Sequence, residues 1–159
     1  MISGSGDPTR PLRDDEFSFI VRNAPLVSLD IVIKDPQDRV LLGRRVNEPA
    51  KRYYFVPGGV IRKNESTQNA FSRILETETG LHASISQATF IGVFEHFYDT
   101  NRFGDPEYGT HYVVLAYELG LTERPSIRLD SQHSDIRWLS GSEILSAPDV
   151  HPNTKAYFR

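Results

Sequence analysis

Alternating apolar and polar positions predict strands in the first half of the chain. Leu26–Ile33 carries a large aliphatic residue at every second position from Leu29 to Ile33, with Asp30 on the opposite face. This period of two is typical of a β-strand. The run Asp35–Asp38 has the composition of a turn, and Arg39–Arg45 then returns as a second strand. The two strands are therefore expected to form a hairpin.

Apolar residues three and four positions apart predict two helices. The first begins with Asp14 or Asp15 as its cap and runs to about Asn23, before Pro25. The second begins after Ser66 or Thr67, either of which can cap it, and ends at Gly80. Each has one apolar face, formed in the second helix by Ala70, Phe71, Ile74 and Leu75.

Most of the remaining segments are rich in β-forming residues. The predicted strands are Tyr53–Val56, Gln87–Asp99, Thr110–Leu119 and Asp135–Leu139. The predicted helices are Ser140–Leu145 and Asn153–Phe158. Strands with helices inserted between them indicate the α/β class. Residues 1–11 are small, polar and turn-rich and are expected to be a flexible leader. Residues 12–159 then form a single domain.

Composition narrows the choice of partners. The 159 residues are 38% hydrophobic and 25% charged, with a net charge of −3 and no cysteine. Disulfides, thiolate metal sites and cysteine nucleophiles are thereby excluded. A mildly acidic chain without long apolar runs argues against nucleic-acid and membrane partners, and the cytoplasm is the expected location.

The stretch Gly58–Leu81 brings together glycines, a basic loop and carboxylates. Gly59, Glu65, Arg73, Leu75, Glu78, Gly80 and Leu81 match the signature Gly-x5-Glu-x7-Arg-Glu-U-x-Glu-Glu-x-Gly-U, where U is a bulky aliphatic residue. The chain thus resembles the Nudix hydrolases. This resemblance implies an α/β/α sandwich with a mixed central sheet.

Two glutamate positions of that signature hold Ile74 and Thr77 instead. The branch of GDP-mannose mannosyl hydrolases also lacks these glutamates, and the chain resembles that branch from about Leu12 to Phe158. The resemblance implies Mg²⁺-dependent hydrolysis of GDP-mannose, or another GDP-hexose, to GDP and the free sugar. Water would attack the anomeric carbon with inversion. It also implies a homodimer.

Magnesium prefers oxygen ligands, and one or two carboxylates plus substrate phosphate commonly suffice. Glu78 and the backbone carbonyl of Gly58 or Gly59 are the leading candidates. The resemblance adds Gln132 to this set, and Mn²⁺ is expected to substitute for Mg²⁺. Glu65 is expected to be structural and tied to Arg73 or to loop amides.

His133 is expected in a polar loop before the last strand, and an imidazole can accept a proton from water near neutral pH. The resembling enzymes place their general base at this position. An exposed histidine without a role is the alternative. Arg44 and Arg45 are adjacent on a strand, so their side chains point to opposite faces. The resemblance selects Arg45 to bind the diphosphate and stabilise the leaving group.

Asp30 is a carboxylate in an otherwise apolar strand and therefore needs a partner or a site. The resemblance implies that Asp30 and His96 contact the sugar, although His96 fits a hydrogen-bonded core histidine nearly as well. It also implies a phosphate contact for Tyr112.

Phe17 and Tyr98 can stack on guanine, although aromatic residues in such segments are more often core. Val60 stands where the closest pattern has an arginine, and Arg62 lies two residues further along the same side of an extended loop. Arg62 is therefore a candidate substrate-binding residue. Two other functions remain open: a Nudix pyrophosphatase that attacks phosphorus, and a sugar-nucleotide-binding module without catalysis.

Overall fold

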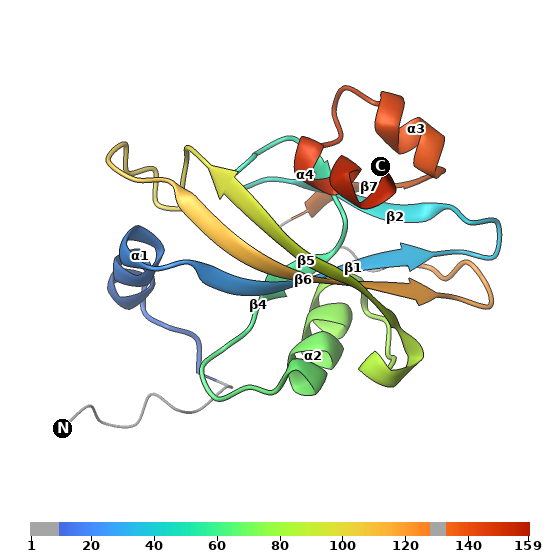
Figure 1. The fold of residues 1–159 in the computed structure, drawn as a ribbon, viewed down its shortest axis with the longest axis horizontal. Coiled ribbons are helices and arrows are strands. Elements are labelled where there is room, and N and C mark those ends of the chain that lie inside the picture. The colour runs from blue at the N-terminus through green and yellow to red at the C-terminus, as the bar shows by residue number, and fades with distance from the viewer. Residues whose placement is uncertain (1–9, 128–132) are drawn as a thin grey trace.

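The computed structural model describes residues 10–127 and 133–159. Within them, seven strands form one sheet in which β3, β2, β1, β6 and β5 lie in that order, while β4 pairs with β1 and β7 with β2 (Figure 1). The strands are β1 (Leu26–Lys34), β2 (Val40–Arg45), β3 (Tyr54–Phe55), β4 (Gly58–Val60), β5 (Thr89–Tyr98), β6 (Thr110–Gly120) and β7 (His133–Leu139). The long strands β1 and β6 run parallel, whereas every other pairing is antiparallel. The predicted mixed sheet and α/β class are confirmed.

The expected β1–β2 hairpin exists but opens immediately after its turn. Lys34 and Val40 are the only paired positions of the two strands. Beyond them β4 takes the edge of β1, and β2 pairs with β3 and β7 instead. Pro57–Gly59 has the composition of a turn, but Gly58 and Gly59 belong to β4 because the opened edge of β1 is free to pair with them.

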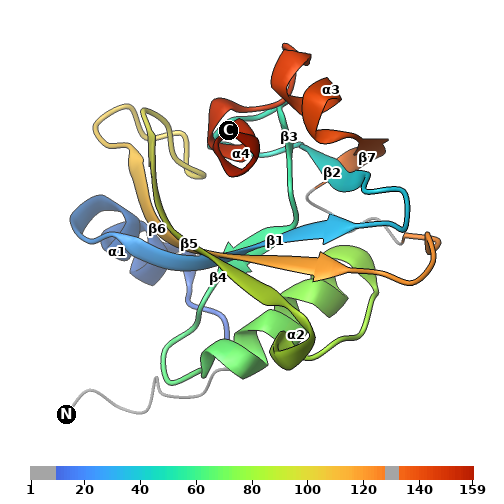
Figure 2. The ribbon, with the colours of Figure 1, turned by 45° about the vertical axis from the view of Figure 1, so that its right-hand side comes forward.

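Helices cover both faces of the sheet (Figures 1 and 2). Helix α2 (Thr67–Thr79) lies on one face, and α3 (Gly141–Ser146), α4 (Pro152–Lys155) and the 3₁₀ turn η2 (Ala156–Phe158) lie on the other. Helix α1 (Asp14–Asn23) flanks the β5–β6 end of the sheet, and a 3₁₀ turn η1 (Ile85–Gln87) precedes β5. None of the described helices is long and apolar enough to cross a membrane.

The caps of α2 follow the sequence. Ser66 Oγ accepts a hydrogen bond from Asn69 N at 3.1 Å, and Gly80 ends the helix in the left-handed conformation with φ 77°. The cap predicted for α1 is wrong by one position. Arg13 is the N-cap, and the Glu16 carboxylate satisfies its backbone amide at 2.9 Å, as in a capping box.

Both faces of β1 are buried, not only its aliphatic face. One core lies between the sheet and α2 and contains Leu29, Ile31 and Ile33. The second lies beneath α3 and α4 and contains Val32. Asp30 therefore sits on a face whose neighbours in the strand are buried, and it needs the partners described below.

Candidate active site

An ion pair fixes the loop that leads into α2. Arg73 Nε donates to Glu65 Oε2 at 2.7 Å and Arg73 Nη2 to Glu65 Oε1 at 2.8 Å, while the amide of Arg62 donates to Glu65 Oε1 at 3.0 Å. Burial raises the pKa of Glu65, but the bonds from Arg73 and Arg62 outweigh it, so the pKa lies below its ordinary value. The expected tie of Glu65 to Arg73 is confirmed.

The register of β4 distinguishes the two candidate glycine carbonyls. Ile31 N donates to Pro57 O at 2.8 Å and Ile61 N to Val27 O at 2.9 Å. Since hydrogen-bonded pairs alternate along an antiparallel ladder, Gly59 opposite Leu29 forms such a pair and Gly58 does not. Gly58 is thus the glycine whose carbonyl points away from β1.

Neither glycine of β4 has room for a side chain. A Cβ at Gly58 would collide with Asp30 Oδ1 and would come within 2.8 Å of Leu29 O. A Cβ at Gly59 would come within 3.1 Å of Ile74, which is itself buried in the core. Ile74 therefore fills the space beside β4 with hydrocarbon at a position where the signature has a glutamate.

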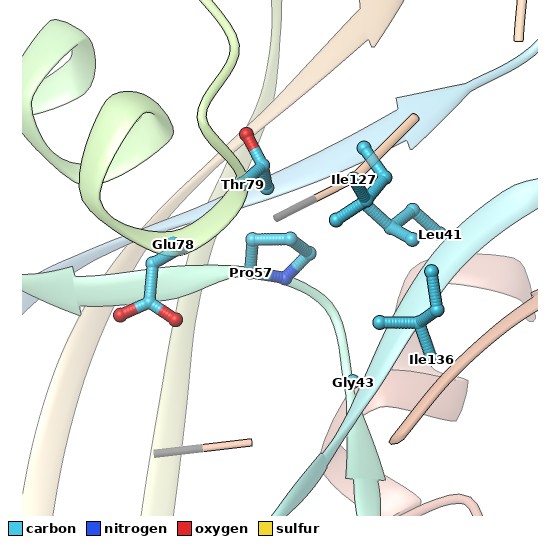
Figure 3. A pocket seen from close by; sticks show the side chains of 7 residues that line it. All are labelled: Leu41, Gly43, Pro57, Glu78, Thr79, Ile127 and Ile136. Carbon is cyan, nitrogen blue, oxygen red and sulfur yellow. The ribbon is translucent and has the colours of Figure 1, made fainter. Parts of the chain in front are cut away.

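Glu78 lies at the end of α2, next to the start of β4. It lines a small pocket together with Leu41, Gly43, Pro57, Thr79, Ile127 and Ile136, in which its carboxylate stands apart from the apolar side chains (Figure 3). The other replaced position, Thr77, is exposed. With Glu65 held by Arg73, Glu78 is the carboxylate that the signature helix offers beside β4.

These donors fit a hard divalent cation. Among the described residues, no three His, Cys, Asp or Glu side chains gather as metal ligands. One carboxylate from Glu78 and the outward carbonyl of Gly58 are the kind of partial oxygen shell that Mg²⁺ completes with phosphate and water. The further predicted ligand, Gln132, lies outside the described residues.

A second group of polar residues gathers on the sheet face beneath α4 and η2. Tyr157 of η2 donates a hydrogen bond to Asp30 Oδ2 at 2.5 Å, and its oxygen lies 3.5 Å from His96 Nε2. Burial raises the pKa of Asp30 to about 6, against the opposing effects of Tyr157 and the charge of Arg45. Burial and the nearby His151 lower the pKa of His96 to about 4, so this imidazole is neutral at pH 7.

The two adjacent arginines of β2 separate as alternation predicts. Arg44 is exposed, and its Nε donates to Arg52 O at 3.2 Å. The Arg45 guanidinium lies 5.5 Å from the centre of the Phe55 ring. Its charge also lowers the pKa values of Asp30 and Tyr112, although burial dominates both shifts and raises them. Arg45 thus places a positive charge in this cluster, and its role at a diphosphate stays a prediction.

Two tyrosines line the same region. The rings of Tyr98 and Tyr112 meet edge to face at 5.9 Å. Burial raises the pKa of Tyr98 to about 12 and also raises that of Tyr112, so both hydroxyls stay protonated and can donate hydrogen bonds at neutral pH.

His151 and Tyr157 belong to this cluster, and sequence reasoning missed both. His151 stacks on Phe55 at 4.9 Å and lies 5.3 Å from the ring of Tyr98. Its Nδ1 accepts a hydrogen bond from Asn153 N at 3.1 Å. The available signal was the polar and aromatic run from His151 to Tyr157, which was interpreted only as a terminal helix.

The structure gives fewer contacts with this cluster for the other predicted site residues. The backbone of His133 pairs with that of Arg45, which brings the start of β7 to the cluster, but the His133 side chain is outside what the structure describes. Phe17 packs edge to face on Phe103 at 5.8 Å, and in the described part of the chain it has no ring contact with Tyr98. Arg62 is half-buried in the loop after β4, with its amide bound to Glu65.

A mixed sheet between helices, with the glycine strand and the Glu65–Arg73 pair beside it, is the arrangement expected of a Nudix domain. A family model described as the NUDIX domain matches residues 24–159. The chain therefore belongs to the Nudix hydrolase family.

Particular relatives can also be named. Over 152 residues the chain is 42% identical to the low-salt glycan biosynthesis protein Agl8 of Haloferax volcanii, covering 94% of this chain and 90% of Agl8. The structure is similar to a MutT protein from Methanosarcina mazei Go1, with a TM-score of 0.70, 18% identity, and coverage of 86% of this chain and 92% of that one.

A third similar structure is the NUDIX domain of Shewanella oneidensis NrtR complexed with ADP ribose. Its TM-score is 0.65 at 18% identity, and the match covers 92% of this chain and 95% of that one. At these identities, the two structural likenesses show a shared fold.

Proposed function

We propose that this protein hydrolyses a GDP-hexose, in the first instance GDP-mannose, to GDP and the free sugar with the help of one Mg²⁺. The observation that carries the proposal is the burial of Ile74 against Gly59. Because Ile74 occupies a glutamate position, Glu78 is left as the signature carboxylate beside β4. A single carboxylate suits one cation bound to a diphosphate better than several metal ions that activate a nucleophilic water. The similarity to a glycan biosynthesis protein supports a sugar-nucleotide substrate.

Glu78, the carbonyl of Gly58 and Gln132 would hold the Mg²⁺, for which Mn²⁺ is expected to substitute. When bound, the cation neutralises charge that develops on the diphosphate as it leaves. Arg45 binds the same diphosphate and Tyr112 donates a hydrogen bond to it, so that both stabilise the leaving group. Arg62 lies on the loop after β4 and supplies a further positive charge.

The reaction is a displacement at carbon. His133 accepts a proton from water, and the water oxygen forms a bond to the anomeric carbon. The bond from that carbon to the phosphate oxygen breaks, and its electron pair leaves with GDP. One displacement inverts the configuration, so an α-linked mannosyl donor releases β-mannose.

Asp30 and His96 bind the sugar, while Tyr98 and Phe17 are candidates for stacking on guanine. The contact of Phe17 with Phe103 fits a core role equally well. The protein would act as a homodimer, as the family resemblance implies, and the cytoplasm stays the location expected from its composition.

Attack at phosphorus by an ordinary Nudix pyrophosphatase is the second candidate. The ADP-ribose complex of a structural relative favours keeping it, because that ligand has a diphosphate between two sugars. A binding module without catalysis is the third; Val60 favours it, whereas the retained Glu78, Gln132, His133 and Arg45 argue against it.

Hydrolysis in oxygen-18 water with GDP-mannose and Mg²⁺ distinguishes these functions. Carbon attack predicts label in mannose and none in GDP, measured by mass spectrometry and phosphorus NMR. Label in GMP or in mannose 1-phosphate would refute carbon attack. Binding without turnover, also for GDP-glucose and GDP-fucose and after Val60→Arg, would favour the binding module.

A further inference from the structure

The end of the chain brings one tyrosine hydroxyl to the residues expected to bind the sugar. Tyr157 bonds to Asp30 across 127 residues of sequence and approaches His96 across 61. Its ring packs edge to face on Phe94 at 4.8 Å, which holds the phenol in place over the sheet. Tyr157 lies far outside the signature stretch Gly58–Leu81.

The carboxylate of Asp30 is held from two sides. Its Oδ2 accepts the 2.5 Å bond from Tyr157, and its Oδ1 lies so close to Gly58 that a Cβ there would collide with it. A rotation of the Asp30 carboxylate would break the hydrogen bond of Oδ2 to Tyr157 or push Oδ1 against Gly58. Asp30 as a residue is nevertheless only half-buried.

The direction of the hydrogen bonds follows from the number of protons. A phenol has one hydrogen, and the short bond assigns it to Asp30, so toward His96 the Tyr157 oxygen can only accept. The pKa of Tyr157 is raised by burial and by Asp30, which keeps that hydrogen in place. His96 is then oriented with its Nε2–H toward Tyr157.

We propose that Tyr157 is a positioning residue whose hydroxyl, which also accepts a hydrogen bond from His96, holds the Asp30 carboxylate in a fixed orientation. In this orientation Asp30 presents a hydrogen-bond acceptor to a hydroxyl group of the bound sugar. This inference rests on the proposed function only in taking a sugar nucleotide as the ligand. Fixed acceptors discriminate among hydroxyl patterns because a misplaced hydroxyl leaves a buried polar group unpaired.

The alternative is that Tyr157 only fastens η2 to the sheet. The two roles differ in what removal of the hydroxyl does to different ligands. A fastening role loosens the whole site and weakens every ligand alike. A positioning role for the sugar affects GDP-mannose and leaves GDP unchanged, since GDP has no hexose.

The test compares protein that keeps Tyr157 with Tyr157→Phe, using Tyr117→Phe as the matched control. Tyr117 lies on the α2 side of the sheet, where its ring contacts Phe71 and Phe90. The dissociation constants of GDP and of GDP-mannose, each with Mg²⁺, are measured by calorimetry in proteins that all carry His133→Gln to slow hydrolysis, and intact sugar nucleotide is checked in the same samples.

Tyr157→Phe is expected to weaken GDP-mannose binding by about tenfold and GDP binding by less than about twofold, as for loss of one hydrogen bond to a charged group. Tyr117→Phe should change neither. Equal weakening of both ligands, no weakening of either, or a failure of the protein that keeps Tyr157 to bind GDP-mannose would overturn the inference. Because binding alone is measured, a failure of carbon attack in oxygen-18 water leaves this result standing.

Discussion

Replacing Glu65 by glutamine tests whether this signature carboxylate holds the structure together or holds metal. The Glu65 side chain is 4% exposed and that of Arg73 26% exposed. Glutamine keeps the shape but removes the charge, and its amide nitrogen would face a guanidinium donor. One of the two bonds to Arg73 is then lost and a donor is left unpaired.

The stability lost in Glu65→Gln should lie between the values typical of surface ion pairs and of buried ion pairs. Exposed ion pairs contribute about 0–1 kcal/mol, whereas removing one partner of a buried pair costs about 3–5 kcal/mol. Because the Arg73 side is partly solvated, we expect Glu65→Gln to lower the free energy of unfolding by about 2 kcal/mol. For a chain of this length, that corresponds to a fall in Tm of about 4–8 °C.

Urea unfolding of metal-free protein measures this loss, with Glu76→Gln as the control. Glu76 lies on the same helix with its side chain 57% exposed, and its ion pair with His82 is 4.0 Å long. The control should lose less than about 0.5 kcal/mol. Since the pKa of folded Glu65 is lowered, its contribution is present at pH 7 and is lost as pH falls below about 4.5.

The reasoning would be refuted by a Glu65→Gln variant as stable as the Glu76→Gln control in the absence of metal. If stability instead differed only when Mg²⁺ was present, Glu65 would be a metal ligand. A difference between wild type and Glu65→Gln that failed to shrink at acid pH would remove the charge from the explanation.

Gly58→Ala should lower the free energy of unfolding by about 1–3 kcal/mol and should also lower turnover, because the new Cβ collides with Asp30. Gly120→Ala places its Cβ in open space, so it should leave both quantities unchanged in parallel assays. The free energy of unfolding of the wild-type protein should fall as pH falls from about 6.5 to about 4, because in this range His96 binds a proton in the unfolded chain but not in the folded protein. In urea titrations across the same pH range, His96→Gln should lose less stability. His133→Gln should reduce kcat by about 10²–10⁴-fold with little change in GDP-mannose binding, and an unchanged kcat would remove the base assignment.

Local signals were sufficient for most elements. Helix α2 begins at the predicted Ser66 cap and ends at the predicted Gly80, because capping depends on residues a few positions away. The parallel pairing of β1 with β6 was not predicted, because the family resemblance implied only a mixed sheet. Periodicity indicates that a segment is a strand but does not indicate its neighbour.

Non-local contacts explain what the sequence did not predict. The glycines of β4 have the composition of a turn, and they become a strand because β1 parts from β2 and leaves an edge to be paired. Asp30 was expected to have a partner, yet Tyr157 could not be identified as that partner because 127 residues separate them. Such pairs are set by the packing of the C-terminal turn on the sheet.

On the proposed function, the metal is held from α2 and β4, and the sugar is bound on the face of β1 that carries Asp30. In the described residues, the burial of Ile74 leaves Glu78 as the α2 carboxylate beside β4, so the metal charge can serve only the diphosphate. The sugar must then be bound by the cluster on the opposite face of β1, where Asp30 is fixed by Tyr157. Substitutions of Glu78, Arg45 or Tyr112, which serve the metal and the diphosphate, should therefore weaken GDP and GDP-mannose alike, whereas substitutions of Asp30 or His96 should weaken GDP-mannose alone.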